Sequence, residues 1–168
     1  MEPTRFSDAG GIKARLDQMG LVLPPTLLLP EGVVLPFALV HVVGKRILIS
    51  GHGPQAADGS LEGVSGRLGE DMDEAQGYAA AKAGALSMLA SLENELGSLD
   101  RIKRWVRVFG MVRCAPGFQR HPNVINGCSD LLLALWGPEK GQHARSAVGM
   151  AELPFGIPVE IEAEAELV

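Results

Sequence analysis

The chain has 168 residues, of which 46% are apolar and 21% charged, and its formal net charge is −5. This length fits one domain with a sizeable core. The mild acidity and the aromatic content of only 5% argue against a broad nucleic-acid-binding surface. Cys114 and Cys128 are too few for a disulfide framework, and the four scattered histidines lack metal-ligand spacing. We therefore expect no metal and no cofactor.

The chain shows no pattern of a secretory signal or a membrane helix. Its first residues lack a charged stretch followed by an apolar one. Its longest apolar region, residues 21–43, is interrupted by prolines and a glutamate. We expect a soluble, reduced protein of the cytoplasm, with no membrane partner.

Residues 1–35 are predicted to form a helix and an extended arm ahead of a domain that spans residues 36–168. Apolar side chains share one face of a helix within residues 1–20: Ile12, Leu16 and Met19. Ser7 or Asp8 is the expected N-cap, and Gly20 is expected to end the helix. Residues 21–35 are rich in proline and have no clear period, which suggests an arm that packs on the body or on a neighbouring subunit.

The remaining pattern predicts an α+β domain of order β-β-α-β-α-β-β, with two helices packed on one face of a mixed sheet. The expected strands are 37–43, 46–50, 101–113, 145–153 and 157–167, and the expected helices are 71–96 and 123–136. Residues 51–69 hold six glycines and are predicted to form a loop. On strand 101–113, Val106 is expected in the core, whereas Trp105 is expected on the opposite face.

The last strand carries a row of carboxylates on one face, at Glu160, Glu162, Glu164 and Glu166. Candidate cations to match this row are Arg101, Lys103, Arg107, Arg113 and Arg145. The simpler interpretation is a solvated face with surface ion pairs. The sharper one is a subunit interface with a cleft that holds one glutamate and one arginine. Trp105, Phe109 and Met111 favour the second interpretation, because this face would otherwise leave them exposed.

Residues 144–165 read ARSAVGMAELPFGIPVEIEAEA and resemble the C-terminal signature of the RidA family, also called YjgF or endoribonuclease L-PSP. Ile49-Ser50-Gly51 followed by Pro54 resembles an earlier segment of that family, and the helix that carries Asn126 resembles a third. The resemblance covers about residues 36–168. It implies a chorismate-mutase-like fold, a homotrimer with clefts between subunits, and hydrolysis of reactive 2-imino or enamino acids to 2-keto acids and ammonia.

The resemblance also implies roles for single residues. Arg145 matches the arginine that binds the substrate carboxylate, and Glu160 matches the glutamate that positions water. Ser50, Gly51 and Asn126 match residues that line the pocket. The family's pocket tyrosine aligns with Phe37 and its common cysteine with Ala147, so a hydroxyl and a thiol are missing here. We expect Arg145 and Glu160 to converge from adjacent strands on one crevice between chains, with a carboxylate-bearing imine or keto acid as the partner.

Other functions stay open at this point. A protein that binds a keto acid without turning it over would use the same arginine, and the family's older name suggests a ribonuclease. Ser50-Gly51-His52 does not match the Gly-x-Ser-x-Gly motif of hydrolases, so Ser50 is not expected to be a nucleophile. His52 and His143 flank the proposed pocket in sequence, but packed or surface histidines are more common. Cys114 and Cys128 are expected to be buried small hydrophobic residues.

Overall fold

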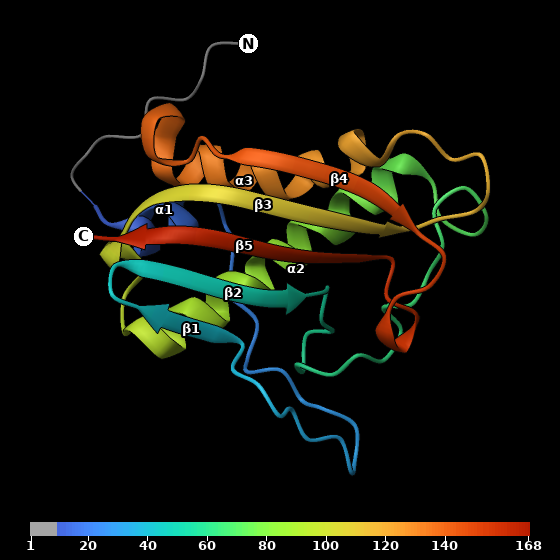
Figure 1. The fold of residues 1–168 in the computed structure, drawn as a ribbon, viewed down its shortest axis with the longest axis horizontal. Coiled ribbons are helices and arrows are strands. Elements are labelled where there is room, and N and C mark those ends of the chain that lie inside the picture. Colours follow the sequence, from blue (N-terminus) through green and yellow to red (C-terminus); the bar gives the residue numbers. More distant parts are fainter. Residues whose placement is uncertain (1–9) are drawn as a thin grey trace.

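Five strands form one mixed sheet in the computed structural model, which describes residues 10–168 (Figure 1). The strands are β1 (Val40–Val43), β2 (Arg46–His52), β3 (Ile102–Arg113), β4 (Ala144–Met150) and β5 (Val159–Leu167). The helices are α1 (Ile12–Gln18), α2 (Glu74–Leu96) and α3 (His121–Lys140), with short 3-10 turns at Leu99–Arg101 and Pro154–Gly156. After α1, this order confirms the predicted sequence of strands and helices.

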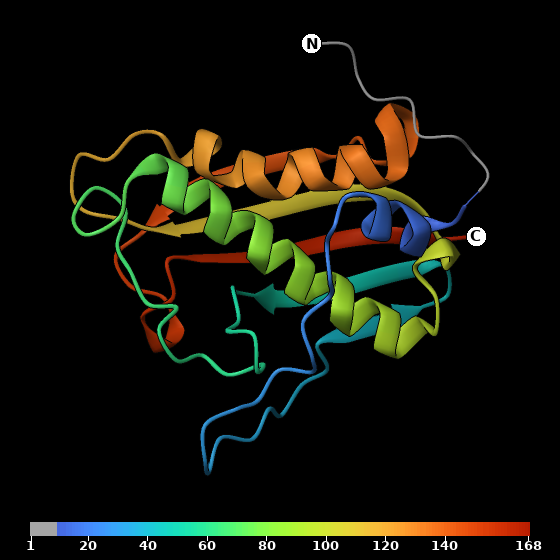
Figure 2. The ribbon, with the colours of Figure 1, turned by 180° about the vertical axis from the view of Figure 1, so that it is seen from behind.

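The sheet has the order β1-β2-β5-β3-β4, and only β3 and β4 run parallel to each other. α2 and α3 lie side by side across one face, as Figure 2 shows, and the core is packed between them and the sheet. Gly127 allows this close approach, because a Cβ there would collide with the backbone of α2 at Tyr78. No helix or strand of residues 10–168 covers the opposite face, which we call the open face (Figure 1). Within residues 10–168, no helix is long and apolar enough to cross a membrane.

The two long helices begin and end where local chemistry requires it. Asp73 accepts a hydrogen bond from the Gln76 backbone at 2.8 Å, and the Gln76 side chain accepts one from the Asp73 backbone, so α2 begins with a capping box. Gly97 ends α2 in the left-handed conformation, at φ 77°. α3 was predicted to end at residue 136, but it continues past a kink at Gly137 to Lys140.

α1 is shorter than predicted, and the residue that caps it comes from elsewhere in the chain. The expected caps Ser7 and Asp8 lie outside the described residues. The Ile12 backbone N–H donates to Asp100 Oδ1 at 2.8 Å, so the 3-10 turn before β3 supplies the acceptor at the start of the helix. Ile12 and Leu16 are buried as predicted, and Gly20 has a positive φ just beyond the helix.

Several strand ends differ from the prediction by a few residues. β1 begins at Val40, so Phe37 precedes it and is exposed. β2 includes Gly51 and His52, which were expected in the loop. β4 ends at Met150 rather than at 153.

The predicted faces of β3 were wrong near its start. Trp105 is buried, at 2% exposed, and packs edge to face on Trp136 with ring centroids 5.4 Å apart. Val106 is 42% exposed. The register of β3 against β5 shifts between Ile102 and Arg104 and again between Trp105 and Arg107. Such irregularities break the two-residue alternation on which the prediction rested. Phe109 and Met111 do lie on the open face, where they pair with Glu162 and Glu160 of β5.

Replacing Trp105 tests this assignment. Trp105→Ala removes a large buried side chain and should lower the free energy of unfolding by about 3–5 kcal/mol. Val106→Ala, one residue further on, should lower it by less than about 1 kcal/mol. Chemical denaturation of both variants measures the difference. Equal losses would contradict the faces described for β3.

Candidate functional site

The carboxylates of β5 lie on the open face, as their spacing predicted, and two of them are paired. Glu164 accepts from Arg46 Nε at 2.8 Å. Glu166 contacts Lys103 Nζ at 3.1 Å and Arg104 Nε at 3.0 Å. These bonds hold the pKa of each carboxyl below its ordinary value. At this end of the strand the simpler interpretation, surface ion pairs, describes the row.

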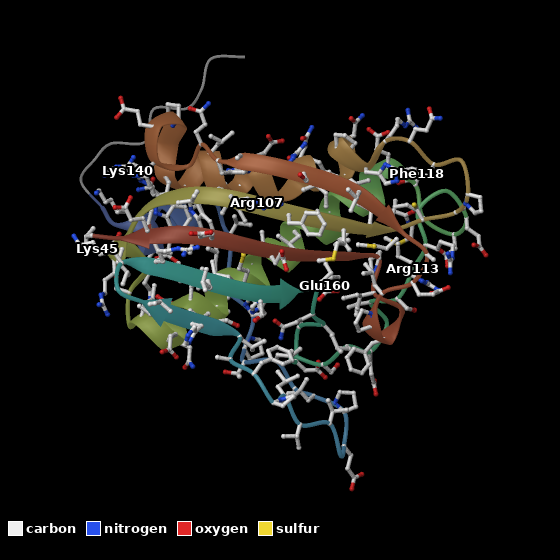
Figure 3. The ribbon with its side chains drawn as sticks, viewed as in Figure 1. Lys45, Arg107, Arg113, Phe118, Lys140 and Glu160 are labelled. Carbon is white, nitrogen blue, oxygen red and sulfur yellow. The ribbon has the colours of Figure 1, made fainter. Side chains whose placement is uncertain are left out.

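Glu160 lies at the other end of β5 and differs from them. It is half-buried on the open face and packs against the backbone of Gly51, where a Cβ would collide with its carboxylate (Figure 3). No described cation forms an ion pair with Glu160 or Glu162. Burial raises the pKa of Glu160 above its usual range, and the negative charge of Glu162 raises it further. A carboxyl with a raised pKa is suited to proton transfer near neutral pH.

Arg145 is held on the other side of the sheet, against α3. Its Nη1 donates to Asn126 Oδ1 and to Ser129 Oγ, each at 2.9 Å, and its Nη2 donates to the carbonyl of Pro122 at 3.3 Å. Asn126 and Ser129 are three residues apart and share one face of α3. The guanidinium therefore has a fixed orientation.

The hydrogen bonds of Arg145 leave one edge of the guanidinium available. They use both Nη1 hydrogens and one Nη2 hydrogen. No residue in 10–168 accepts from Nε or from the second Nη2 hydrogen. A guanidinium with such an edge can bind a carboxylate through two parallel hydrogen bonds.

Arg145 and Glu160 do not lie on adjacent strands, contrary to expectation, and they do not meet within one chain. β4 and β5 are not adjacent, because β3 lies between them. Arg145 pairs in register with the buried Val108 and points toward α3, whereas Glu160 pairs with Met111 and points to the open face. The edge position of β4 and the irregular register of β3 are not visible in the sequence, and the prediction missed both.

The other expected site residues fall into two groups. The first, which we call the glutamate group, is Phe37, Ser50, Gly51 and Glu160. Phe37 and Ser50 line one depression of about 530 Å³ on the open face, together with Arg107 and Phe109. The Ser50 hydroxyl donates to the Ala38 carbonyl at 2.8 Å, so it is already engaged.

The second group, which we call the arginine group, is Asn126, Arg145 and Ala147. Ala147 follows Arg145 by two residues on β4 and packs against the core from the same face. The prediction missed Ser129 and the Pro122 carbonyl as partners of Arg145. The spacing of Ser129 from Asn126 is the signal that could have revealed it.

The surroundings of His52 and of the two cysteines are those of structural residues. His52 is buried and contacts the Ser50 carbonyl and Ser91 Oγ, and burial lowers its pKa. Cys128 is buried as predicted, and burial raises the pKa of its thiol to about 12. Cys114 is only partly buried, with Sγ 3.4 Å from His121 Nε2. Among residues 10–168, His, Cys, Asp and Glu side chains form no cluster that could hold a metal ion.

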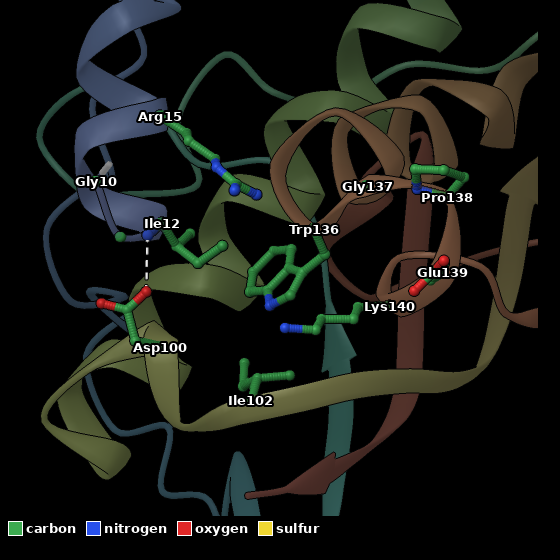
Figure 4. Close-up of a pocket in the computed structure, with 11 residues that line it drawn as sticks. Gly10, Ile12, Arg15, Asp100, Ile102, Trp136, Gly137, Pro138, Glu139 and Lys140 are labelled. Carbon is green, nitrogen blue, oxygen red and sulfur yellow. Dashed lines mark hydrogen bonds between the residues drawn. The ribbon is translucent and has the colours of Figure 1, made fainter. Parts of the chain in front are cut away.

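Another depression, of about 820 Å³, lies away from both groups, between α1 and the end of α3 (Figure 4). Trp136 and Ile102 form its apolar wall, and charged side chains of both signs surround it, including Arg15 and Lys140. One of its two acidic residues, Asp100, caps α1. None of the expected site residues lines it.

Comparison with known proteins identifies the family. Residues 13–159 match the family described as "YjgF/chorismate_mutase-like, putative endoribonuclease". The chain belongs to this family. It is 37% identical over 159 residues to "Protein TCP17" of Trypanosoma cruzi, covering 95% of this chain and 96% of that protein. The family membership and the sheet described above confirm the predicted α+β, chorismate-mutase-like fold.

Solved structures of relatives agree with this assignment. A protein of unknown function from Agrobacterium tumefaciens superposes with a TM-score of 0.81 at 34% identity, covering 94% of this chain and 93% of that one. A protein named as a putative endoribonuclease from Shewanella oneidensis superposes with a TM-score of 0.83 at 32% identity, covering 94% and 100%. The fold is thus shared over nearly the full length of both relatives.

The raised pKa of Glu160 can be measured directly. Glu162→Gln removes a neighbouring negative charge. The loss of this charge favours the ionised form of Glu160, so the pKa of Glu160 should fall toward its ordinary value. Glu164→Gln is the matched control, because Glu164 is paired with Arg46 and does not perturb Glu160. Titration of carboxyl carbon resonances by NMR measures both variants. A pKa of Glu160 that ignores Glu162 would contradict the described electrostatics.

Proposed function

We propose that the protein hydrolyses small 2-imino or enamino acids of the 2-aminoacrylate type to 2-keto acids and ammonia. The observation that carries the proposal is the available edge of the Arg145 guanidinium, fixed by three hydrogen bonds. A free carboxylate on the substrate would bind to this edge in one orientation. Family membership supports the proposal, since the resemblance in sequence includes Arg145 and Glu160.

We infer that the site is completed by a second subunit, as in a homotrimer. The arginine group lies at β4, an edge strand whose outer side pairs with no described strand. The glutamate group lies on the open face, where Phe37 is 55% and Val43 is 52% exposed. Unpaired edges and exposed apolar side chains are surfaces that proteins usually cover. Packing the β4 edge of one subunit beside the open face of another would bring the two groups together.

The chemistry needs only water and proton transfer. Ionised Glu160 accepts a proton from water while the water oxygen forms a bond to the imine carbon. Glu160 returns that proton to the nitrogen, which gives a carbinolamine. The carbinolamine hydroxyl then gives its proton to the amine nitrogen as the carbonyl forms, the carbon–nitrogen bond breaks, and ammonia leaves the keto acid. An enamino acid first takes up a proton at carbon and loses one from nitrogen, which converts it to the imine. Arg145 orients the substrate carboxylate throughout. Phe37 and Ala147 supply no hydroxyl or thiol, so water activation falls to Glu160.

Two other functions remain to be separated from this one by experiment. A keto-acid sensor would bind 2-oxobutyrate through Arg145 without accelerating imine hydrolysis. A ribonuclease is suggested by the names of relatives, and incubation with structured and single-stranded RNA tests it. The net charge of −5 does not favour RNA as a substrate.

The kinetic roles of the two residues should differ. Arg145→Ala removes substrate binding and should raise KM for the imine by about 10- to 100-fold. Glu160→Gln removes the base and should lower kcat by about 100-fold or more with a smaller change in KM. A coupled assay that generates 2-aminoacrylate and follows keto-acid release measures both. Equal rates with and without the wild-type protein would refute the activity, and full activity of Arg145→Ala would refute the site.

Mixing the two impaired variants tests whether one site is built from two chains. In random mixed assemblies of Arg145→Ala and Glu160→Gln subunits, about a quarter of the interfacial sites regain both side chains. At substrate concentrations below the wild-type KM, where both variants are slow, activity should therefore recover to about a quarter of the wild-type value. Co-expression or unfolding and refolding of the mixture provides the sample, and separately assembled variants combined without exchange are the control. No recovery after exchange would show that each site belongs to one chain.

A further inference from the structure

A continuous chain of hydrogen bonds runs from Arg145 to the end of α3. Ser129 Oγ accepts from Arg145 Nη1 at 2.9 Å and lies 2.9 Å from His143 Nε2. His143 Nδ1 lies 2.7 Å from the carbonyl of Gly141, the C-cap residue of α3. Ser129 is 8% exposed, so its hydroxyl has little access to water.

The direction of each proton in this chain follows from its two ends. The Gly141 carbonyl can only accept, so His143 Nδ1 carries the hydrogen and donates it. A guanidinium can only donate, so Ser129 Oγ accepts from Arg145 and gives its own hydrogen to His143 Nε2. Neutral His143 with its hydrogen on Nδ1 satisfies both ends. The other neutral tautomer loses the bond to Gly141, and the imidazolium reverses the bond to Ser129, because Nε2 then donates to Oγ.

We propose that Ser129 and His143 are positioning residues that hold the Arg145 guanidinium in the orientation that binds the substrate carboxylate. This inference rests on the proposed function. Asn126 and Pro122 fix the guanidinium from the first turns of α3, and the chain through Ser129 fixes it from the last turn. The available Nε–Nη2 edge is defined by all of these contacts together.

The same geometry makes the orientation sensitive to pH. Burial lowers the pKa of His143, and the positive charge of Arg145 lowers it further, against the opposing effect of the hydrogen bond to the Gly141 carbonyl. The net shift favours the neutral imidazole. Protonation puts a hydrogen on Nε2, which removes the acceptor of the Ser129 hydroxyl and places a second cation beside Arg145. Other charged groups line the same depression as His143 and come from α3, β3 and β5: Glu139, Arg104 and Glu166. Cys128 of α3 lies near Arg145. Glu166 is already engaged with Lys103 and Arg104.

The chain can be tested without any ligand. Nitrogen-edited NMR of the full-length protein should show His143 with its hydrogen on Nδ1 and a pKa below the ordinary value for histidine. Ser129→Ala removes the hydroxyl that favours neutral His143, and Arg145→Met removes a positive charge, so each should raise that pKa. A hydrogen on Nε2, or a pKa unchanged in both variants, would overturn the proposal.

The consequence for binding needs a conservative variant. Calorimetry with 2-oxobutyrate should give a dissociation constant about three- to tenfold higher for His143→Ala. His143→Gln keeps an acceptor for Ser129 and should bind like the wild type. Gln142→Ala, at the exposed neighbouring position, is the matched control and should not change affinity. If His143→Gln and His143→Ala bind equally well, the positioning role is wrong.

The pH dependence of keto-acid binding, compared between the wild type and His143→Gln, separates the effect of protonating His143 from that of protonating Glu160. The wild-type protein should bind 2-oxobutyrate more weakly as the pH falls through the pKa of His143, whereas His143→Gln should lose this component. The α-carboxylate of the ligand titrates well below this range. A wild-type protein that binds no keto acid but shows the coupled His143 titration would refute the proposed function and uphold the chain of hydrogen bonds. A protein that binds the keto acid but lacks the coupled His143 titration would uphold the proposed function and refute the chain of hydrogen bonds.

Discussion

The strict alternation of β5 is the constraint on which the rest of the structure depends. β5 lies between β2 and β3 and pairs with both, so its register sets the faces of its neighbours. Its apolar side chains are buried beneath the helices, and its four glutamates all reach the open face. Carboxylates two residues apart on one strand repel each other, so this face cannot close over itself as a dry core. The open face must either stay in contact with water or be neutralised by cations and covered by a second surface.

The glutamates at the two ends of this row differ in ion pairing because their neighbours on the adjacent strands differ. Glu164 and Glu166 lie beside β2 and β3 at positions that carry basic residues, and ion pairs form there. Glu160 lies beside Gly51 and Met111, neither of which carries a charge, and it is more buried. One end of the strand is therefore a solvated surface, while the other holds a carboxyl that is easier to protonate. The same strand supplies both without any irregularity of its own.

Much of the fold could be predicted from periodicity, because β5, α2 and α3 each repeat one pattern over many residues. The failures lie where the backbone departs from its period. The register shifts of β3 place Trp105 in the core and leave Val106 exposed. The residue types in this segment do not predict such shifts. The sequence suggested candidate site residues, but it did not show how they are arranged in space. Arg145 lies on an edge strand that is separated from β5 by β3, which only the order of strands in space reveals.

The cap of α1 has a consequence for the order of folding during synthesis. A helix of seven residues is too short to be stable alone in water. The Ile12 N–H at the start of α1 donates to Asp100, and Arg15 donates to the Leu135 carbonyl in α3. Both partners leave the ribosome long after α1 does. α1 is thus synthesised before both of its partners, and it can reach its final position only after residues 100 and 135 have been made.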